Sequence, residues 1–355
     1  MMEQYDYVWK IYGADSIWNT FPFDDGIDEA FTLISYDRTQ IVLDVSDSSD
    51  TARVVLGGDF TYSGPLTADN LGDVGGSPRT LKIYEDQILT QEEQYPDGIS
   101  MSMLFKGGYA LEMALITGND YFAGSPLPHA NSNDGIRGGD GNDTFIGYGA
   151  APGWDQFYGE AGIDTAIFRG KISEYLIEES SSIWDSRLRD GTNATGYVVT
   201  DRLNARDDAT ALVEVERLQF SDVTLALDID GIAAEAYRIY KAAFDRQPDL
   251  TGLGFWIKNM DAGMGLEAVA QEFINSAEFI RMYGANPTDE QFVDLLYANV
   301  LDRQADKSGY DFWIGALDRG LTRAGLLAEF SESRENVANV APLIEDGIQY
   351  VAFVG

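Results

Sequence analysis

The chain contains no cysteine in its 355 residues and only one histidine, His129. The absence of cysteine excludes disulfides and thiolate zinc sites. A single histidine excludes the H-E-x-x-H motif of metalloproteases, and neither the G-x-S-x-G elbow of lipases nor the G-x-x-x-x-G-K-[ST] phosphate loop occurs. Glycosidase or lyase carboxylates would pair in space and leave no motif among the 59 acidic residues. We therefore assign no catalytic residue, and an enzyme is not the favoured interpretation.

Basic residues are scarce. The chain has 24 Lys and Arg against 59 Asp and Glu, which gives a formal net charge of −35. Such acidity argues against nucleic acid and against anionic membrane surfaces as partners. It serves either solubility alone or the binding of divalent cations. No apolar run approaches the roughly 18 residues of a membrane span, and residues 1–15 lack the features of a secretory signal peptide.

A stretch rich in glycine and aspartate lies near the middle of the chain. Residues 138–146, GGDGNDTFI, fill every place of the nonapeptide G-G-x-G-x-D-x-U-x, in which U is a large apolar residue. The glycines allow a tight turn whose carbonyl oxygens converge, and Asp143 adds a carboxylate oxygen. The residues that follow form a short strand with Phe145 directed inward. The nonapeptide thus predicts one turn and one strand, with calcium at the turn.

Weaker copies of this pattern flank the motif, with an aspartate before apolar residues at Asp120, Asp134, Asp155 and Asp164. Asp134 lies nine residues before Asp143, and Asp155 lies nine before Asp164, which is the period of the repeat. The other two intervals, of 14 and 12 residues, carry insertions that a solenoid tolerates as loops. The recurrence favours a repeat over a Gly/Asp-rich surface loop with one chance match.

Residues 116–170 therefore resemble the parallel β-roll of the RTX (repeats-in-toxin) proteins, which Gram-negative bacteria export through type I secretion systems. In that family each calcium ion lies between stacked turns. The resemblance implies a best site formed by the carbonyl oxygens of Gly139 and Gly141 with Asp143, and closed by the carbonyl oxygens of Gly159 and Ala161 with Asp164.

The resemblance also implies a neighbouring site, formed by Gly118, Asp120, Gly138, Asp140 and Asp143. At the opposite edge it pairs Asp134 with Asp155. The glycines expected there are replaced by Ala130, Ser132, Ala150 and Pro152.

The segments before and after the expected roll are both predicted to be β structure. Residues 1–115 are expected to form a β-rich, sandwich-like domain, with short apolar or alternating runs at 41–45, 53–56, 81–84 and 99–103. Residues 171–230 resemble the β cap that follows an RTX roll, with strands expected at 172–177, 196–200 and 212–220.

Residues 231–339 are expected to be an all-α domain built from a duplicated unit. The segment FDRQPD at 244–249 returns as LDRQAD at 301–306, and Phe255-Trp256 returns as Phe312-Trp313, both 57 residues later. The unit resembles a domain of unassigned function that often follows RTX repeats in secreted bacterial proteins. Asp249 and Asp306 are expected to be helix N-caps, and the tryptophans to pack in the core rather than bind sugars.

Residues 340–355 form an apolar tail with one acidic pair and no basic residue. The tail resembles the uncleaved C-terminal signals of type I export, and a closing helix or strand is the alternative. Overall, the resemblance implies a multidomain calcium-binding protein located outside a Gram-negative cell or on its surface. Its partners would be Ca²⁺, the exporter, and a polysaccharide or cell-surface ligand or further copies of itself. A carbohydrate-active extracellular enzyme and a self-assembling surface-layer protein remain the alternatives.

Overall fold

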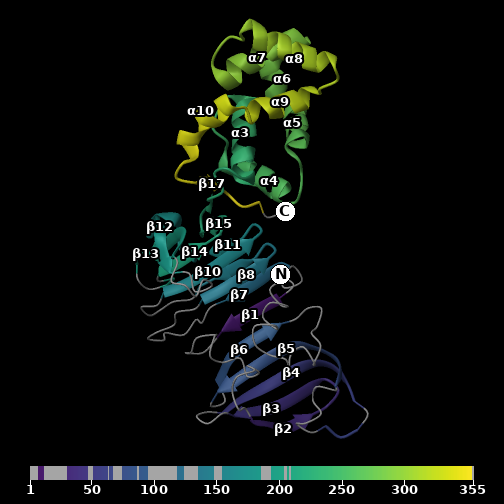
Figure 1. The fold of residues 1–355 in the computed structure, drawn as a ribbon, viewed down its shortest axis with the longest axis vertical. Helices are drawn as coiled ribbons and strands as arrows, with labels where there is room; N and C mark the ends of the chain where they lie inside the picture. The colour runs from purple at the N-terminus through teal and green to yellow at the C-terminus, as the bar shows by residue number, and fades with distance from the viewer. Residues whose placement is uncertain are drawn as a thin grey trace. The chain divides into compact units, whose positions relative to one another are not determined.

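The computed structural model describes residues 7–11, 30–46, 51–62, 64–66, 74–85, 88–94, 118–123, 135–147, 154–184, 193–203, 206–207 and 209–353. The chain divides into two compact units, Met1–Ser221 and Asp222–Gly355. The first unit is rich in β-strands, and helices α3 to α10 belong to the second (Figure 1). The expected β-rich N-terminal and helical C-terminal parts are thereby confirmed.

The N-terminal strands are β1 (Tyr7–Ile11), β2 (Ala30–Tyr36), β3 (Gln40–Ser46), β4 (Thr51–Thr61), β5 (Gly75–Glu85) and β6 (Ile88–Gln94). Strands β2 to β6 pair antiparallel in chain order (Figure 1). Apolar residues alternate along them, and the register sets Leu43 beside Val54 and Val54 beside Ile83, all at most 1% exposed. The strands predicted at 41–45, 53–56 and 81–84 are confirmed, whereas 99–103 lies outside the described residues. The sandwich-like arrangement stays a prediction, because these described strands share one sheet.

The middle of the first unit consists of two rows of parallel strands. One row contains β7 (Asp120–Ala123), β9 (Thr144–Ile146), β11 (Thr165–Ile167) and β15 (Arg217–Gln219). The other contains β8 (Gly135–Asp140), β10 (Trp154–Ala161) and β14 (Ala209–Val213). Both rows continue into antiparallel strands, so the sheets are mixed: β1 pairs parallel with β7 and antiparallel with β6.

Apolar side chains fill the space around these parallel strands. Phe122 and Phe145 are aligned in one row, Ile136 and Phe157 in the other, and all four are at most 2% exposed. The rings of Phe145 and Phe157 stack with 5.1 Å between their centroids, so side chains from the two rows pack together. Burying several large aromatic side chains fixes the spacing of the turns that connect the rows.

A hairpin interrupts the parallel strands. It consists of β12 (Tyr175–Trp184) and β13 (Asn193–Asp201), follows the short helix η4 (Ile172–Glu174), and pairs antiparallel with β14. The expectation of one continuous strand over 212–220 is wrong, because β14 and β15 lie in different sheets. Glu214 between them adopts a left-handed backbone with a φ of 55°, which turns the chain.

The second unit contains α3 (Ile232–Phe244), α4 (Leu250–Asp261), α5 (Leu266–Asn275), α6 (Ala277–Tyr283), α7 (Asp289–Leu301), α8 (Lys307–Asp318), α9 (Arg323–Ser331) and α10 (Arg334–Ile344). Helices α7 to α10 repeat α3 to α6, each beginning 57 residues after its counterpart. Asp249 accepts the N–H of Gly252, and Asp306 accepts the N–H groups of Ser308 and Gly309, so both predicted N-caps are confirmed. Trp256 and Trp313 pack against the helical core, as predicted.

The duplication extends to an ion pair in each half. Arg246 makes a two-pronged contact with Glu278 at 2.8 and 3.1 Å, and its guanidinium lies 5.0 Å from the ring centre of Tyr240. Fifty-seven residues later, Arg303 contacts Glu335 at 2.7 and 2.8 Å. Each arginine lies just after the first helix of its half, and its glutamate partner lies in the fourth helix, so the ion pair joins these two elements. The repeated arginine therefore has a structural role.

The C-terminal tail packs within the second unit. Strand β17 (Ile348–Tyr350) pairs antiparallel with β16 (Thr224–Ala226), and Ile348 and Tyr350 are buried. The N–H of Val351 donates to the carbonyl oxygen of Leu250 at 3.0 Å. The expectation of a closing strand is confirmed, and the export signal stays a prediction. Within the described part of the chain, none of the helices has the length and apolar character needed to cross a membrane.

Candidate functional site

A column of acidic side chains runs along one edge of the parallel strands. Asp120, Asp143, Asp164 and Glu216 each stand at, or directly before, the start of a strand: β7, β9, β11 and β15. The strand registers place Tyr121 beside Thr144, Thr144 beside Thr165, and Thr165 beside Arg217, so the four acids are also aligned. Three of them, Asp120, Asp143 and Asp164, are at most 1% exposed.

Hydrogen bonds between successive turns hold this column together. The N–H of Asp120 donates to Oδ1 of Asp143, the N–H of Asp143 donates to Oδ1 of Asp164, and the N–H of Asp164 donates to Oε2 of Glu216, each at 2.8 Å. Asp143 and Asp164 therefore each use one carboxylate oxygen to accept a hydrogen bond from the preceding turn. The second oxygen of these two carboxylates, Oδ2, has no hydrogen-bond partner among the described residues.

A column of glycines lets the turns stack this closely. Gly118, Gly141 and Gly162 have φ values of 101°, 132° and 145°, which are unfavourable for residues with a Cβ. A Cβ on Gly141 would lie 1.7 Å from the carbonyl oxygen of Gly118, and one on Gly162 would lie 1.7 Å from that of Gly141. The glycines expected to form tight turns are thus also required by the approach of one turn to the next.

The second oxygen of Asp143 points to a place that a side chain cannot occupy. Among the described residues, Asp143 Oδ2 is buried without a hydrogen-bond partner. A Cβ built on Gly138 would lie 2.3 Å from this oxygen and 2.8 Å from the carbonyl oxygen of Gly159. Two acceptor oxygens from consecutive turns therefore converge near the Cα of Gly138. Such an arrangement fits a hard cation, which prefers carboxylate and carbonyl oxygens.

The electrostatics of this edge point the same way. Burial raises the pKa of Asp143 to about 6, with further contributions from Glu160 and Asp140. Burial likewise raises the pKa of Asp164 to about 8, and its charged neighbours Asp143, Glu216 and Glu160 add to the increase. Ionised carboxylates are therefore unfavourable here without a compensating positive charge.

The structure brings several of the predicted ligands together in this region. Gly138 and Gly159 adjoin the convergent oxygens, and Asp164 lies one turn from Asp143. The carbonyl of Ala161 instead accepts the N–H of Gly141 at 2.8 Å, so it serves the stacking of turns. In the register of β8 and β10, Gly139 lies beside Glu160, whose side chain contacts Arg137 at 2.7 Å.

The neighbouring predicted site adds Gly118, Asp120 and Asp140 to Gly138 and Asp143. The N–H of Gly118 donates to the carbonyl oxygen of Asp140 at 2.6 Å, while the Asp140 side chain is exposed. At the opposite edge Asp155 is buried, and a Cβ on Gly147 would lie 3.1 Å from its Oδ2. Its predicted partner Asp134 lies outside the described residues, as do Ala130, Ser132, Ala150 and Pro152.

Sequence reasoning missed two contributions to the turns. Asn119 Oδ1 accepts the N–H of Asn142, and Asn142 Oδ1 accepts the N–H of Ile163, so asparagines form a second column beside the acids. The Asn-Asp pairs at 119–120 and 142–143 were a signal for it. Glu216, the last member of the acidic column, lies in no glycine-rich repeat and had no such signal.

Across the described ranges, no three His, Cys, Asp or Glu side chains gather closely enough to hold a metal ion by themselves. A cation at this edge would therefore depend on main-chain carbonyls together with one or two carboxylates. Calcium accepts such ligand sets, because it binds six to eight oxygens in flexible geometry.

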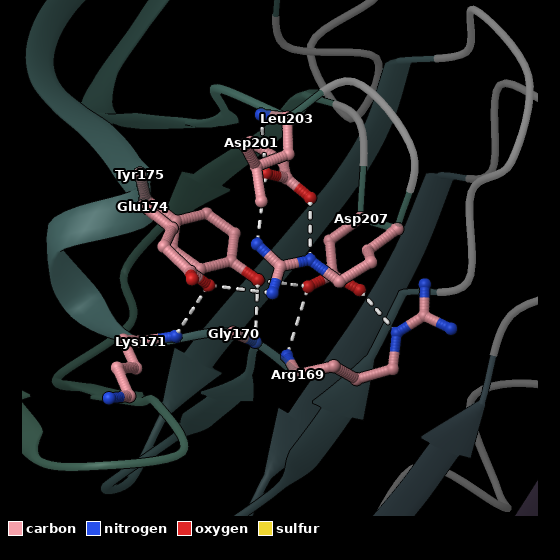
Figure 2. A network of polar contacts seen from close by, with 9 residues as sticks. Arg169, Gly170, Lys171, Glu174, Tyr175, Asp201, Leu203 and Asp207 are labelled. Carbon is pink, nitrogen blue, oxygen red and sulfur yellow. Dashed lines mark hydrogen bonds and ion pairs between the residues drawn. The ribbon is translucent and has the colours of Figure 1, made fainter.

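A second polar cluster, at the base of the β12–β13 hairpin, is compensated within the protein. Figure 2 shows Asp207 beside Arg169 and the hydroxyl of Tyr175, and Asp201 near Glu174. Asp207 accepts the main-chain N–H of Arg169 at 2.9 Å and a hydrogen bond from the Tyr175 hydroxyl, while Tyr175 in turn accepts the N–H of Gly170 at 2.8 Å.

Arg206 completes this cluster. Its guanidinium contacts Asp201 at 3.0 Å and Glu174 at 2.7 Å, and lies 5.4 Å from the ring centre of Tyr175. The hydrogen bond from Arg206 lowers the pKa of Glu174. Basic side chains thus neutralise the acids of this cluster, whereas the charges that act on Asp164 are acidic. The hairpin cluster is structural, and the acidic column is the candidate binding site.

A family model matches part of the helical unit. The family model of a domain of unknown function, DUF4214, matches residues 270–340. The match extends from α5 into α10 and so includes most of the second helical repeat. No curated protein and no solved structure matches the chain significantly.

Proposed function

We propose that this chain is a secreted calcium-binding protein of the cell surface or extracellular matrix, in which residues 116–170 fold as a parallel β-roll around calcium. One observation carries the proposal: the buried Oδ2 of Asp143, without a hydrogen-bond partner among the described residues, lies beside the carbonyl oxygen of Gly159. The alternation of the chain between two rows of parallel strands supports the roll.

The residues fit calcium better than a smaller ion. Asp143 would supply a carboxylate oxygen and Gly159 a carbonyl oxygen, with the other predicted carbonyls and Asp164 nearby. Magnesium demands a near-ideal octahedron and retains its water, which suits this carbonyl-rich edge poorly. When bound, calcium would neutralise the desolvated carboxylates that otherwise repel one another.

Calcium binding would thereby be coupled to folding, since the turns form only when their acidic side chains approach each other. Extracellular calcium modules bind at roughly 10⁻⁴ to 10⁻³ M, so the roll would remain unfolded in the cytosol of a Gram-negative bacterium and fold outside. This order of events suits type I export through the C-terminal tail. The flanking domains would then bind a polysaccharide or cell-surface ligand, or further copies of the chain.

The experiment compares the full-length protein in EDTA, in millimolar magnesium and in millimolar calcium. We expect calcium to increase β-structure by circular dichroism and to raise the melting temperature of the β-rich unit, with magnesium giving a much smaller gain. The magnesium sample controls for general screening of the charge of −35. Equal effects of both ions, or identical spectra in EDTA and calcium, would contradict the proposal.

Matched variants connect the effect to the site. Asp143→Asn retains the acceptor for the Asp120 N–H but removes the carboxylate charge, so it should abolish most of the calcium gain. Glu178→Gln makes the same charge change at an exposed position of β12 and should keep the gain. If both variants respond to calcium as the parent does, the ion binds elsewhere.

A further inference from the structure

The convergence of oxygens seen at Asp143 occurs again one turn later. Asp164 is 0% exposed, and its Oδ2 has no hydrogen-bond partner within the described ranges. A Cβ built on Gly159 would lie 2.4 Å from this oxygen and 2.0 Å from the carbonyl oxygen of Glu214. Asp164 Oδ2 and the carbonyl oxygen of Glu214 thus converge near the Cα of Gly159. Asp143 Oδ2 and the carbonyl oxygen of Gly159 converge near the Cα of Gly138 in the same way.

The following turn is unlike the others in sequence. Residues 214–216, Glu-Val-Glu, contain neither glycine nor aspartate, and they follow the inserted hairpin rather than a repeat. Glu214 nevertheless has a φ of 55°, a left-handed conformation that glycines adopt at the equivalent turns. Its side chain is exposed, so its contribution at this place is the main-chain oxygen.

Glu216 takes the place that an aspartate has in each earlier turn. Its Oε2 accepts the N–H of Asp164 at 2.8 Å, as Asp164 Oδ1 does for Asp143 and Asp143 Oδ1 does for Asp120. This turn has three residues between β14 and β15, and the longer glutamate side chain reaches the hydrogen bond that aspartate makes elsewhere. Arg217 follows, and its Nη1 donates to the carbonyl oxygen of Glu216 at 3.1 Å.

We infer that the chain has a second divalent-cation site, formed by Asp164 Oδ2 and the carbonyl oxygen of Glu214 and closed by the carboxylate of Glu216. The site rests on the proposed calcium function, and it differs from the Asp143 site in that residues outside the glycine-rich repeats complete it. Its ligand is calcium, because the oxygens come from the main chain and from carboxylates in an irregular turn. The ion would join the last repeat to the segment that follows the hairpin.

The first test measures calcium stoichiometry by equilibrium dialysis of the full-length protein and of Glu216→Gln. Glutamine retains an acceptor for the Asp164 N–H, so the substitution mainly removes charge. We expect one calcium equivalent to be lost or weakened by about tenfold or more, because affinity follows the number of charged ligands. Glu178→Gln is the matched control, because it makes the same charge change at an exposed position of β12 that takes no part in the site, and it should leave binding unchanged.

The outcomes separate this inference from the function on which it rests. If the parent protein binds no calcium, the proposed function fails. If the parent binds calcium and Glu216→Gln binds it with the same stoichiometry and affinity, the second site alone is wrong. A crystal structure of the parent grown with calcium gives an independent answer should the variant not fold. An ion bonded to Asp164 Oδ2 and the Glu214 carbonyl supports the inference, and a water molecule there overturns it.

Discussion

The main-chain N–H of Asp143 donates a 2.8 Å hydrogen bond to Oδ1 of Asp164, which lies 21 residues further along the chain. This bond fixes the Asp164 carboxylate in one orientation while engaging only one of its oxygens. The other oxygen is held in a buried position beside Gly159. The column of acids is therefore pre-organised: the protein provides the orientation, and a cation would provide the missing partner.

The stability of the metal-free protein should decrease as the pH rises from about 4 to above 8. The pKa values of Asp143 and Asp164, about 6 and about 8, exceed the ordinary value of 3.8, so the folded chain binds more protons than the unfolded chain in this range. The resulting stabilisation is complete below about pH 4 and is lost as the pH passes through the two raised pKa values. Saturating calcium should flatten the dependence.

The measurement is the melting temperature of the β-rich unit by calorimetry between pH 5 and 9, in chelator and in calcium. The double variant Asp143→Asn/Asp164→Asn serves as the control, because amides do not titrate. It should show a much weaker pH dependence in chelator and should be more stable than the parent at pH 8. A parent protein whose metal-free stability increases over this range would contradict the assignment of raised pKa values.

Substituting a stacked glycine should disrupt the β-rich unit. Gly141→Ala places a Cβ 1.7 Å from the carbonyl oxygen of Gly118 and requires a non-glycine residue at a φ of 132°. Gly263→Ala is the control, because Gly263 also has a positive φ, of 94°, but a Cβ there meets nothing within 4 Å. Backbone strain should cost about 1–2 kcal/mol at each position.

The steric overlap adds to that cost only at Gly141, where the turns must separate. We expect Gly141→Ala to lose the calcium-induced gain in melting temperature, and Gly263→Ala to retain it. Thermal melts in chelator and calcium compare the two. Equal losses in both variants would mean that backbone strain alone determines the effect and that the turns are not closely stacked.

The hairpin cluster should stabilise the protein independently of calcium. Tyr175→Phe removes the hydroxyl that donates to Asp207 and accepts from the N–H of Gly170. Leaving these buried groups without their partner should cost about 1–3 kcal/mol. Chemical denaturation at two calcium concentrations, both high enough to keep the roll folded, should give the same difference from the parent. A penalty that changes with the calcium concentration would show that the cluster belongs to the ion-binding edge.

The two neighbouring aromatic residues of α8 should behave differently. The ring centre of Trp313 lies 5.3 Å from that of Phe330, which is 2% exposed, whereas Phe312 is 58% exposed. Trp313→Ala should destabilise the helical unit by about 2 kcal/mol, less than the ~3–5 kcal/mol of a fully buried aromatic residue. Phe312→Ala should change stability by about 0.5 kcal/mol at most.

Urea unfolding followed by circular dichroism at 222 nm measures both effects. The same two variants, applied to immobilised polysaccharides, address the alternative that the tryptophans bind sugars. If Trp313→Ala folds with undiminished stability but loses polysaccharide binding, the packing role is wrong and the aromatic pair is a recognition surface.

Much of the organisation follows from local pattern. The nonapeptide at 138–146 predicts a turn followed by the strand at Thr144–Ile146, because glycine, aspartate and an apolar residue have separate roles at fixed positions. The 57-residue repeat predicts a duplicated helical unit, and it places Asp249 and Asp306 at equivalent helix starts. Hydrophobic periodicity and helix capping depend on residues that lie close together along the chain, so both can be recognised in the sequence.

Only the tertiary structure brings together groups that are distant along the chain. Glu216 lies 52 residues after Asp164, and the hairpin between them hides the continuity of the column. Every residue has a carbonyl oxygen, so a sequence motif cannot single out the one of Glu214. The left-handed turn that directs this oxygen lies between β14 and β15. The predicted 212–220 strand was wrong for the same reason: apolar alternation continues through these residues, while the turn depends on stacking against earlier strands. Local chemistry determined which residues make turns, and packing decided which turns face each other.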